Sequence, residues 1–188
     1  MKKIWVLLSM WLLVSCSSSL PQKNYYLLTH GHQSSVKPAA IETVNDFIWI
    51  APVNIANFLN KDGLVYQTDP YQYVTATNNL WASPLVAQLQ EQVVSELSAL
   101  LPQRLVSAAP LATPTATVKL FISGFHGSYL GDVIIEGYWI IMDDQGRTQR
   151  KNFSYQLPQT ADGYDAMVKT LSQGWYNEVQ DLVNKVKL

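Results

Sequence analysis

A run of large apolar side chains over Val133–Met142, interrupted only by Glu136 and Gly137, sets the architecture that this chain can adopt. Successive side chains of a strand point to opposite faces of a sheet, so this run places apolar groups on both faces. Such a strand needs cover on both sides, which indicates a central strand. The expected inner set is Val133, Ile135, Trp139 and Ile141, and the expected outer set is Ile134, Tyr138, Ile140 and Met142.

An apolar stripe at helical spacing predicts a first helix from Pro84 to Leu101, followed by Pro102. Ser83 is the expected N-cap because its hydroxyl can accept a backbone N–H bond, and Pro84 suits the first helical position. The polar residues off the stripe are expected on the solvent side of a helix that packs on a sheet. They are Gln88, Glu91, Gln92, Ser95 and Glu96.

A second apolar stripe predicts the last helix, with Asp162 as its N-cap. Its members recur at spacings of four and three residues, as one face of a helix requires. They are Tyr164, Val168, Leu171, Trp175, Val179, Leu182 and Val186.

Short runs rich in β-branched and aromatic residues predict the strands, and turn residues separate them. Turns are expected at Asn60–Gly63 and Asp143–Gly146, a bend or turn at Gly124–Gly131, a loop at Thr29–Asn45, and a strand end or edge at Pro52. The predicted strands besides Val133–Met142 are Asn24–Leu28, Phe47–Val53, Leu64–Thr68, Tyr71–Thr75, Val118–Ile122 and Thr148–Leu157.

The order of these elements predicts the α+β class: a single domain whose mixed or antiparallel sheet carries both helices on one face. That arrangement leaves the outer set of the central strand without cover. Either a loop such as Thr29–Asn45 or a second subunit can bury it, and we favour the second subunit. Only 14% of the residues are charged, which suits a recognition surface or simply a polar, uncharged one.

The N-terminus has the pattern of an export signal. Lys2 and Lys3 precede an apolar segment, Ile4–Val14, and Ser15 is the small residue before a cleavage point. About 11 residues at ~1.5 Å each span only half of a ~30 Å hydrocarbon core, so a permanent transmembrane helix is disfavoured. We therefore expect a signal peptide at residues 1–15, a lipidated tether at 16–23 and a periplasmic domain at 24–188.

Leu13-Val14-Ser15-Cys16 resembles the bacterial lipobox, and Cys16 is the only cysteine of the chain. The resemblance implies that the Cys16 thiol is diacylated, the signal removed and the new N-terminus acylated. The alternative is an ordinary signal peptide with a chance cysteine, although a free thiol is a redox liability in an exported protein. The residue after the cysteine is Ser17 rather than the aspartate of the inner-membrane sorting rule, which favours the outer membrane.

Other chemistries find little support in the sequence. A net charge of −1 does not suit nucleic acid. His30 and His32 lack nearby third and fourth ligands, with His126 the only other histidine, so no metal or other cofactor is expected. No nucleophile elbow or zinc-protease motif is present, and a hairpin turn explains Asp143 and Asp144 better than acid–base work. We predict no catalytic residue and no enzyme.

Three further stretches carry a resemblance to a known family: Gly63–Thr68, Asn78–Leu85 and Thr160–Val168. With the lipobox at Cys16, their order and spacing resemble the ABC-type transport auxiliary lipoproteins, and most closely the paraquat-inducible intermembrane transport members. The family supplies no catalytic or ligand residue, so only Cys16 carries over as a site.

The resemblance implies a lipoprotein on the periplasmic side of the outer membrane that moves lipids or other hydrophobic molecules between membranes and supports envelope integrity. Its implied partners are an MCE-domain tunnel protein, an inner-membrane multipass protein and further copies of itself in a ring. A monomeric lipid-binding carrier and a structural outer-membrane lipoprotein without cargo remain as alternatives.

Overall fold

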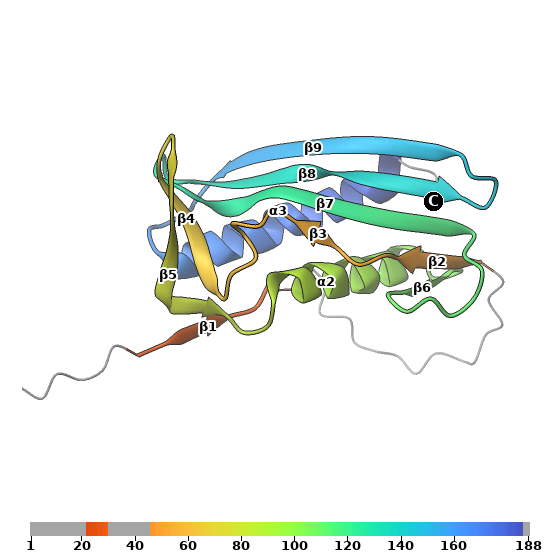
Figure 1. Ribbon diagram of the computed structural model, residues 1–188, viewed down its shortest axis with the longest axis horizontal. Coiled ribbons are helices and arrows are strands. Elements are labelled where there is room, and N and C mark those ends of the chain that lie inside the picture. Colours follow the sequence, from red (N-terminus) through yellow and green to blue (C-terminus); the bar gives the residue numbers. More distant parts are fainter. Residues whose placement is uncertain (1–21, 30–45, 186–188) are drawn as a thin grey trace, which may run out of the picture.

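The computed structural model describes residues 22–29 and 46–185 (Figure 1). Within these ranges the elements, in chain order, are β1 (Asn24–Tyr26), β2 (Phe47–Ile50), β3 (Asn54–Ile55), β4 (Gly63–Asp69), β5 (Gln72–Trp81), α2 (Leu85–Leu100), β6 (Leu105–Ser107), β7 (Ala116–Ser128), β8 (Asp132–Asp143), β9 (Thr148–Pro158) and α3 (Tyr164–Lys185). Neither helix of this described part is long and apolar enough to cross a bilayer.

Strand β7 organises the sheet. Along one edge it pairs antiparallel with β8 from Ala116 to Gly127. Along the other edge it pairs in succession with β2, β3 and β4, each in parallel. β7 therefore has an antiparallel neighbour along one edge and parallel neighbours along the other, so the sheet is mixed, which is one of the two alternatives that the sequence left open.

Two antiparallel hairpins and two short parallel strands complete the sheet. β8 and β9 form one hairpin, through the predicted turn at Asp143–Gly146, and β4 and β5 form the other. β1 lies parallel to β5, and β6 lies parallel to β2. β6 was not predicted, and β5 continues to Trp81, beyond the predicted end at Thr75.

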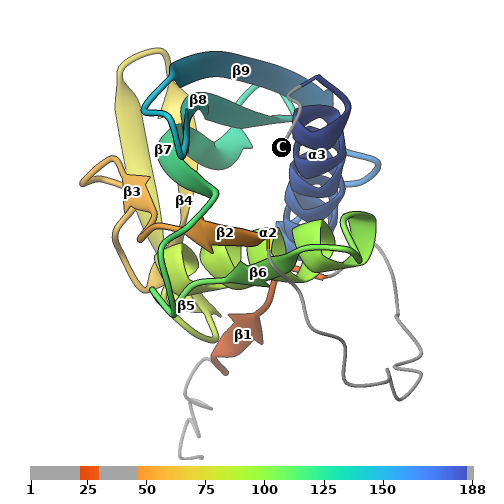
Figure 2. The same ribbon diagram turned by 90° about the vertical axis from the view of Figure 1, so that its right-hand side faces the viewer.

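Both helices pack on the inner face of the strongly bent sheet, where α2 also contacts α3 (Figure 2). Aromatic rings fill the space between α3 and the sheet: Trp139 stacks on Trp175 with centroids 5.6 Å apart, and Phe125 and Phe153 pack against Trp175. The predicted α+β class, with two helices on one face of the sheet, is confirmed.

The two faces of β8 divide as the alternation predicted. The inner set, Val133, Ile135, Trp139 and Ile141, is buried beneath the helices. The outer set, Ile134, Tyr138, Ile140 and Met142, is only half-buried, and neither described helix covers it.

The start of α2 differs from the prediction. Pro84 is the N-cap, and no side chain caps the helix, so Ser83 is not the cap. Gln88 instead ties the helix to the preceding residue, since its Nε2 donates to the Ser83 carbonyl at 2.7 Å.

Three of the five polar residues expected on the solvent side of α2 are buried: Gln88, Gln92 and Glu96. The reason is that α2 packs against α3 as well as against the sheet. A helix in contact with two elements buries a wider sector than one apolar stripe covers.

The start of α3 also differs by one residue from the prediction. Met167 N donates to the Gly163 carbonyl at 3.1 Å, so Gly163, not Asp162, occupies the N-cap position. Gly163 has a φ of +103°, a conformation that side-chain-bearing residues rarely adopt. The chain's turn into the helix therefore requires glycine here.

The predicted bend or turn over Gly124–Gly131 is wrong for most of its length. β7 continues to Ser128, with a register shift between Ile122 and Gly124. Gly127 serves close packing, because a Cβ there would lie 2.5 Å from Met167 Sδ and 2.7 Å from Tyr66 Cδ2. The chain turns only after Ser128, where Gly131 N bonds to the Ser128 carbonyl.

Candidate functional site

The predicted lipidation site, Cys16, lies outside the described residues, but the structure shows how the chain that follows it is held. β1 pairs with the end of β5, from Asn24 opposite Asn79 to Tyr26 opposite Trp81. Tyr26 Oη donates to Asp165 Oδ1 at 2.7 Å. Burial, together with this hydrogen bond, raises the pKa of Tyr26 to about 12. β1 is therefore bound to both the sheet and the first turn of α3.

Leu28 and Thr29, the second and third residues after β1, hydrogen-bond to the two helices. Leu28 N donates to Gln88 Oε1 at 2.8 Å, and Thr29 N donates to Ser172 Oγ at 3.2 Å. Gln92 Nε2 donates to the Thr29 carbonyl at 2.9 Å. Buried amides need such partners, so the glutamines of α2 fix this segment to the body.

The three stretches that carry the family resemblance come together at the end of the molecule where β1 lies (Figure 1). Gly63–Thr68 forms most of β4, which pairs with β5 in the second stretch, Asn78–Leu85. The third stretch, Thr160–Val168, begins α3, and Tyr26 Oη joins its Asp165 to Asn79 of the second stretch. Residues far apart in sequence thus build one region, which we call the tether end.

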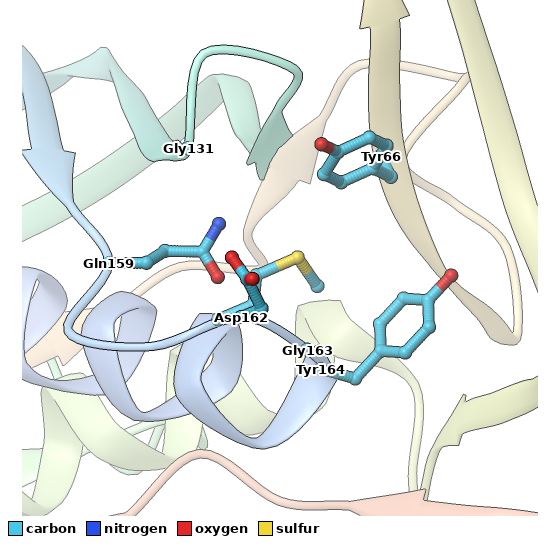
Figure 3. A pocket seen from close by; sticks show the side chains of 7 residues that line it. Tyr66, Gly131, Gln159, Asp162, Gly163 and Tyr164 are labelled. Carbon is cyan, nitrogen blue, oxygen red and sulfur yellow. The ribbon is translucent and has the colours of Figure 1, made fainter.

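A pocket of about 340 Å³ opens at the tether end (Figure 3). Tyr66, Tyr164 and Met167 supply apolar walls, and Asp162 and Gln159 supply polar groups. The volume is near the lower limit of ligand pockets, about 300–1,000 Å³. Sequence reasoning identified two of the contributing stretches but not the cavity, because their contact depends on the glycine at position 127.

The outer sheet face, defined as Phe121, Ile134, Tyr138, Ile140 and Met142, is a second candidate surface. Phe121 stacks on Tyr138 with centroids 4.6 Å apart, and the Arg150 guanidinium lies 3.9 Å from the centroid of the Tyr138 ring. The face is rigid because β7, β8 and β9 are paired along nearly their whole lengths. It suits a flat protein contact rather than a small ligand.

Within the described residues, the histidines and the adjacent aspartates Asp143 and Asp144 do not come together in one site. His30 and His32 lie outside the described residues, while buried His126 contacts the rings of Phe58 and Tyr73. No cluster of three potential metal ligands occurs within the described ranges.

Asp143 and Asp144 lie in the β8–β9 turn, at the opposite end of the long axis from the tether end (Figure 1). Arg147 Nε donates to Asp143 Oδ2 at 2.6 Å, and this hydrogen bond lowers the pKa of Asp143. The Asp143 carboxylate also accepts from the backbone N–H groups of Gln145 and Arg147. Its role is to order the turn, as the sequence indicated.

Comparison with known proteins gives consistent results. The family model for the ABC-type transport auxiliary lipoprotein component matches residues 26–183. The intermembrane transport lipoprotein PqiC of Escherichia coli K12 is 37% identical over 190 aligned positions, which cover 100% of this chain and 98% of the relative.

Solved structures share the fold. A crystal structure of an uncharacterized protein superposes with a TM-score of 0.76 at 38% identity, covering 87% of this chain and 98% of the other. A structure from Xanthomonas campestris gives a TM-score of 0.65 at 17% identity, covering 85% and 92%. The predicted resemblance is confirmed: this chain belongs to the ABC-type transport auxiliary lipoprotein component family.

Proposed function

We propose that this chain is the outer-membrane-anchored lipoprotein of an intermembrane transport system for lipids or other hydrophobic molecules. In this proposal Cys16 carries the acyl chains, and the folded body on the periplasmic side docks an MCE-domain tunnel protein. An inner-membrane multipass protein is the third component of the system. The role is non-enzymatic and contributes to envelope integrity.

One observation carries the proposal: the 37% identity that extends over the whole chain to a protein named as an intermembrane transport lipoprotein. The lipobox-like stretch before Cys16 agrees with it. So does the fixation of Leu28 and Thr29 between the helices, since an anchored body needs a firm connection to its tether.

We assign the outer sheet face to contact between copies of this chain in a ring. Half-buried Tyr138, Ile140 and Met142 form an apolar row along β8, with no described helix above it, and their partners on the neighbouring strands include Lys119, Arg150 and Asn152. Burial of such a surface against a neighbour is favourable by about 25 cal/mol per Å². The ring then presents one shared docking site to the tunnel protein.

The test is purification of the tagged full-length chain from detergent-solubilised cells, with its oligomeric state measured by light scattering and its partners by mass spectrometry. Wild type should be oligomeric and retain the MCE-domain protein. The double variant Tyr138→Glu with Ile140→Glu should be monomeric and lose it, whereas Lys169→Glu, on the exposed side of α3, should retain both. A monomeric wild type without an MCE partner contradicts the proposal.

The pocket at the tether end favours a second candidate, a monomeric lipid carrier. Its walls include apolar groups of Tyr66, Tyr164 and Met167, but its 340 Å³ is small for a phospholipid with two acyl chains. We therefore rank docking above carriage. About one phospholipid per chain, co-purified with a variant that begins at Ser17 and so lacks both the signal segment and Cys16, would reverse this ranking.

A further inference from the structure

Two turns at the tether end present large apolar side chains to solvent. Tyr71, in the β4–β5 turn, is 91% exposed, and Leu130, in the β7–β8 turn, is 63% exposed, with Tyr129 beside it. We call Tyr71, Tyr129 and Leu130 the tip patch. The two turns are neighbours because β4 and β7 pair up to the register of Gln67 with Ser128.

Hydrogen bonds fix both turns in this conformation. Asp69 Oδ1 accepts from the backbone N–H groups of Tyr71 and Gln72, at 2.7 and 3.0 Å. In the second turn, Leu130 N donates to Ser128 Oγ at 3.2 Å. These bonds restrain the backbone of both turns in the conformation that leaves Tyr71 and Leu130 exposed.

The tip patch and the entry of the chain lie at the same end of the molecule but at opposite ends of the β4–β5 hairpin, since β1 pairs with Asn79–Trp81 and Tyr71 lies in the turn. β1 and the β4–β5 hairpin occupy the same end of the molecule, opposite the β8–β9 turn (Figure 1). Only residues 17–23 separate Cys16 from Asn24, and fully extended they reach about 25 Å at ~3.5 Å per residue. An acylated Cys16 therefore keeps this end close to the bilayer surface.

Residue types at the tip patch match a lipid–water interface. Tyrosine combines an apolar ring with a hydroxyl and is enriched at headgroup level, and leucine adds apolar area. Neither Thr68–Gln72 nor Ser128–Asp132 contains a lysine or arginine, whereas Asp69 and Asp132 are acidic. The two turns themselves therefore offer no cation to anionic headgroups, and a zwitterionic surface fits the tip patch best.

We propose that the tip patch seats in the interfacial layer of a zwitterionic phospholipid membrane and so orients the body, with the tether end against the membrane and the β8–β9 turn away from it. The inference rests on the proposed Cys16 anchor for bringing the membrane near. The anchor supplies the affinity, and the patch supplies the orientation.

The experiment uses the mature chain, residues 16–188, whose single thiol is coupled to a maleimide phospholipid in phosphatidylcholine nanodiscs with spin-labelled headgroups. Leucine methyl signals are observed by NMR. Leu130 should lose intensity, while Leu111, which is 62% exposed and lies between β6 and β7, should keep it. The double variant Tyr71→Ser with Tyr129→Ser should abolish this difference, and Leu105→Ser should preserve it.

Three results overturn the inference. Equal intensity losses at Leu130 and Leu111, or none at either, show that the body has no preferred orientation. Concentration-dependent broadening of Leu130 without nanodiscs assigns the patch to a second copy. Recovery of the Leu130 signal when the MCE-domain protein is added assigns it to that partner. Because the maleimide coupling replaces the acyl chains, a failure of acylation in cells is detected separately, by the mass of the native protein.

Discussion

At the scale of single residues, Glu178 shows how the helix–sheet contact is specified. Its side chain is fully buried, and its carboxylate accepts from Trp139 Nε1 at 2.6 Å, Lys151 Nζ at 2.5 Å and Tyr155 Oη at 2.7 Å. Lys151 also lies 3.1 Å from Asp181. Burial and the hydrogen bond to Glu178 raise the pKa of Tyr155. This cluster fixes α3 against β8 and β9 in one register.

Removal of the cation from this cluster should destabilise the folded state. Lys151→Met leaves the buried Glu178 carboxylate without its cationic partner, so we expect the free energy of unfolding to fall by about 3 kcal/mol. Adding Glu178→Gln should recover part of the loss, whereas exposed Lys169→Met should change stability by less than about 0.5 kcal/mol. Urea denaturation measures all three, and equal stability of Lys151→Met and wild type would contradict the assignment.

His126 should make stability depend on pH. Its burial lowers its pKa, an effect that Glu136 and the Gly127 carbonyl oppose only in part. Below the unfolded-state pKa of about 6.5, the unfolded chain binds a proton that the folded chain does not, so stability falls as pH drops further. The stability advantage of wild type over His126→Gln should therefore shrink between pH 7 and pH 5. A constant difference across urea titrations in that range contradicts this.

At the scale of elements, the alternation of side chains predicted both faces of β8 correctly, because pairing with β7 and β9 enforces a period of two. The apolar stripe of α2 could not predict which of its polar residues are buried, since their burial depends on where α3 packs. A signal was present: Gln88, Gln92 and Glu96 recur every four residues beside the apolar stripe. Polar residues at that spacing can line a buried seam that must bind backbone groups.

The candidate site, like the buried face of α2, depends on long-range packing that the sequence does not show. The stretches Gly63–Thr68 and Thr160–Val168 were recognisable in the sequence, but their meeting at Tyr66 and Met167 follows from the parallel pairing of β4 with β7. Gly127 indicated a turn from its type alone, whereas its function is to permit close contact with these two side chains. Long-range pairing of this kind leaves no local pattern.

The connection between tether and core can be tested through Gln88. Gln88→Leu removes the acceptor for Leu28 N, a hydrogen bond worth about 1–1.5 kcal/mol, so amide exchange of Leu28 should accelerate by about tenfold. Glu91→Gln, on the exposed side of the same helix, should leave it unchanged. Hydrogen exchange followed by NMR provides the measurement, and an unchanged rate in Gln88→Leu would show that Leu28 is held by other contacts.

At the scale of the whole molecule, the two ends of the long axis differ. The tether end has the tip patch and the three family stretches, whereas the opposite end has a cleft whose lining includes the charged residues Asp46, Arg104, Asp143 and Arg147. This polarity fits a body that faces a membrane at one end and water or a partner at the other. The proposed ring would align these ends in every copy.

Sorting to the outer membrane should depend on the residue after the acylated cysteine. Ser17→Asp introduces the inner-membrane signal, so the protein should move to the inner-membrane fraction in an enterobacterium-like host. Ser18→Asp, one residue further along, is the matched control and should remain in the outer membrane. Density-gradient fractionation of the envelope decides between them, and an unmoved Ser17→Asp variant would show that sorting is determined elsewhere.

The central claim is that Cys16 anchors this body to a membrane, and the mass of the N-terminal peptide of the protein purified from cells tests it most directly. The account predicts a chain that begins at Cys16 and has three acyl chains, two on the thiol-linked glycerol and one on the amine. A chain that begins elsewhere, or an unmodified Cys16 thiol, would contradict it.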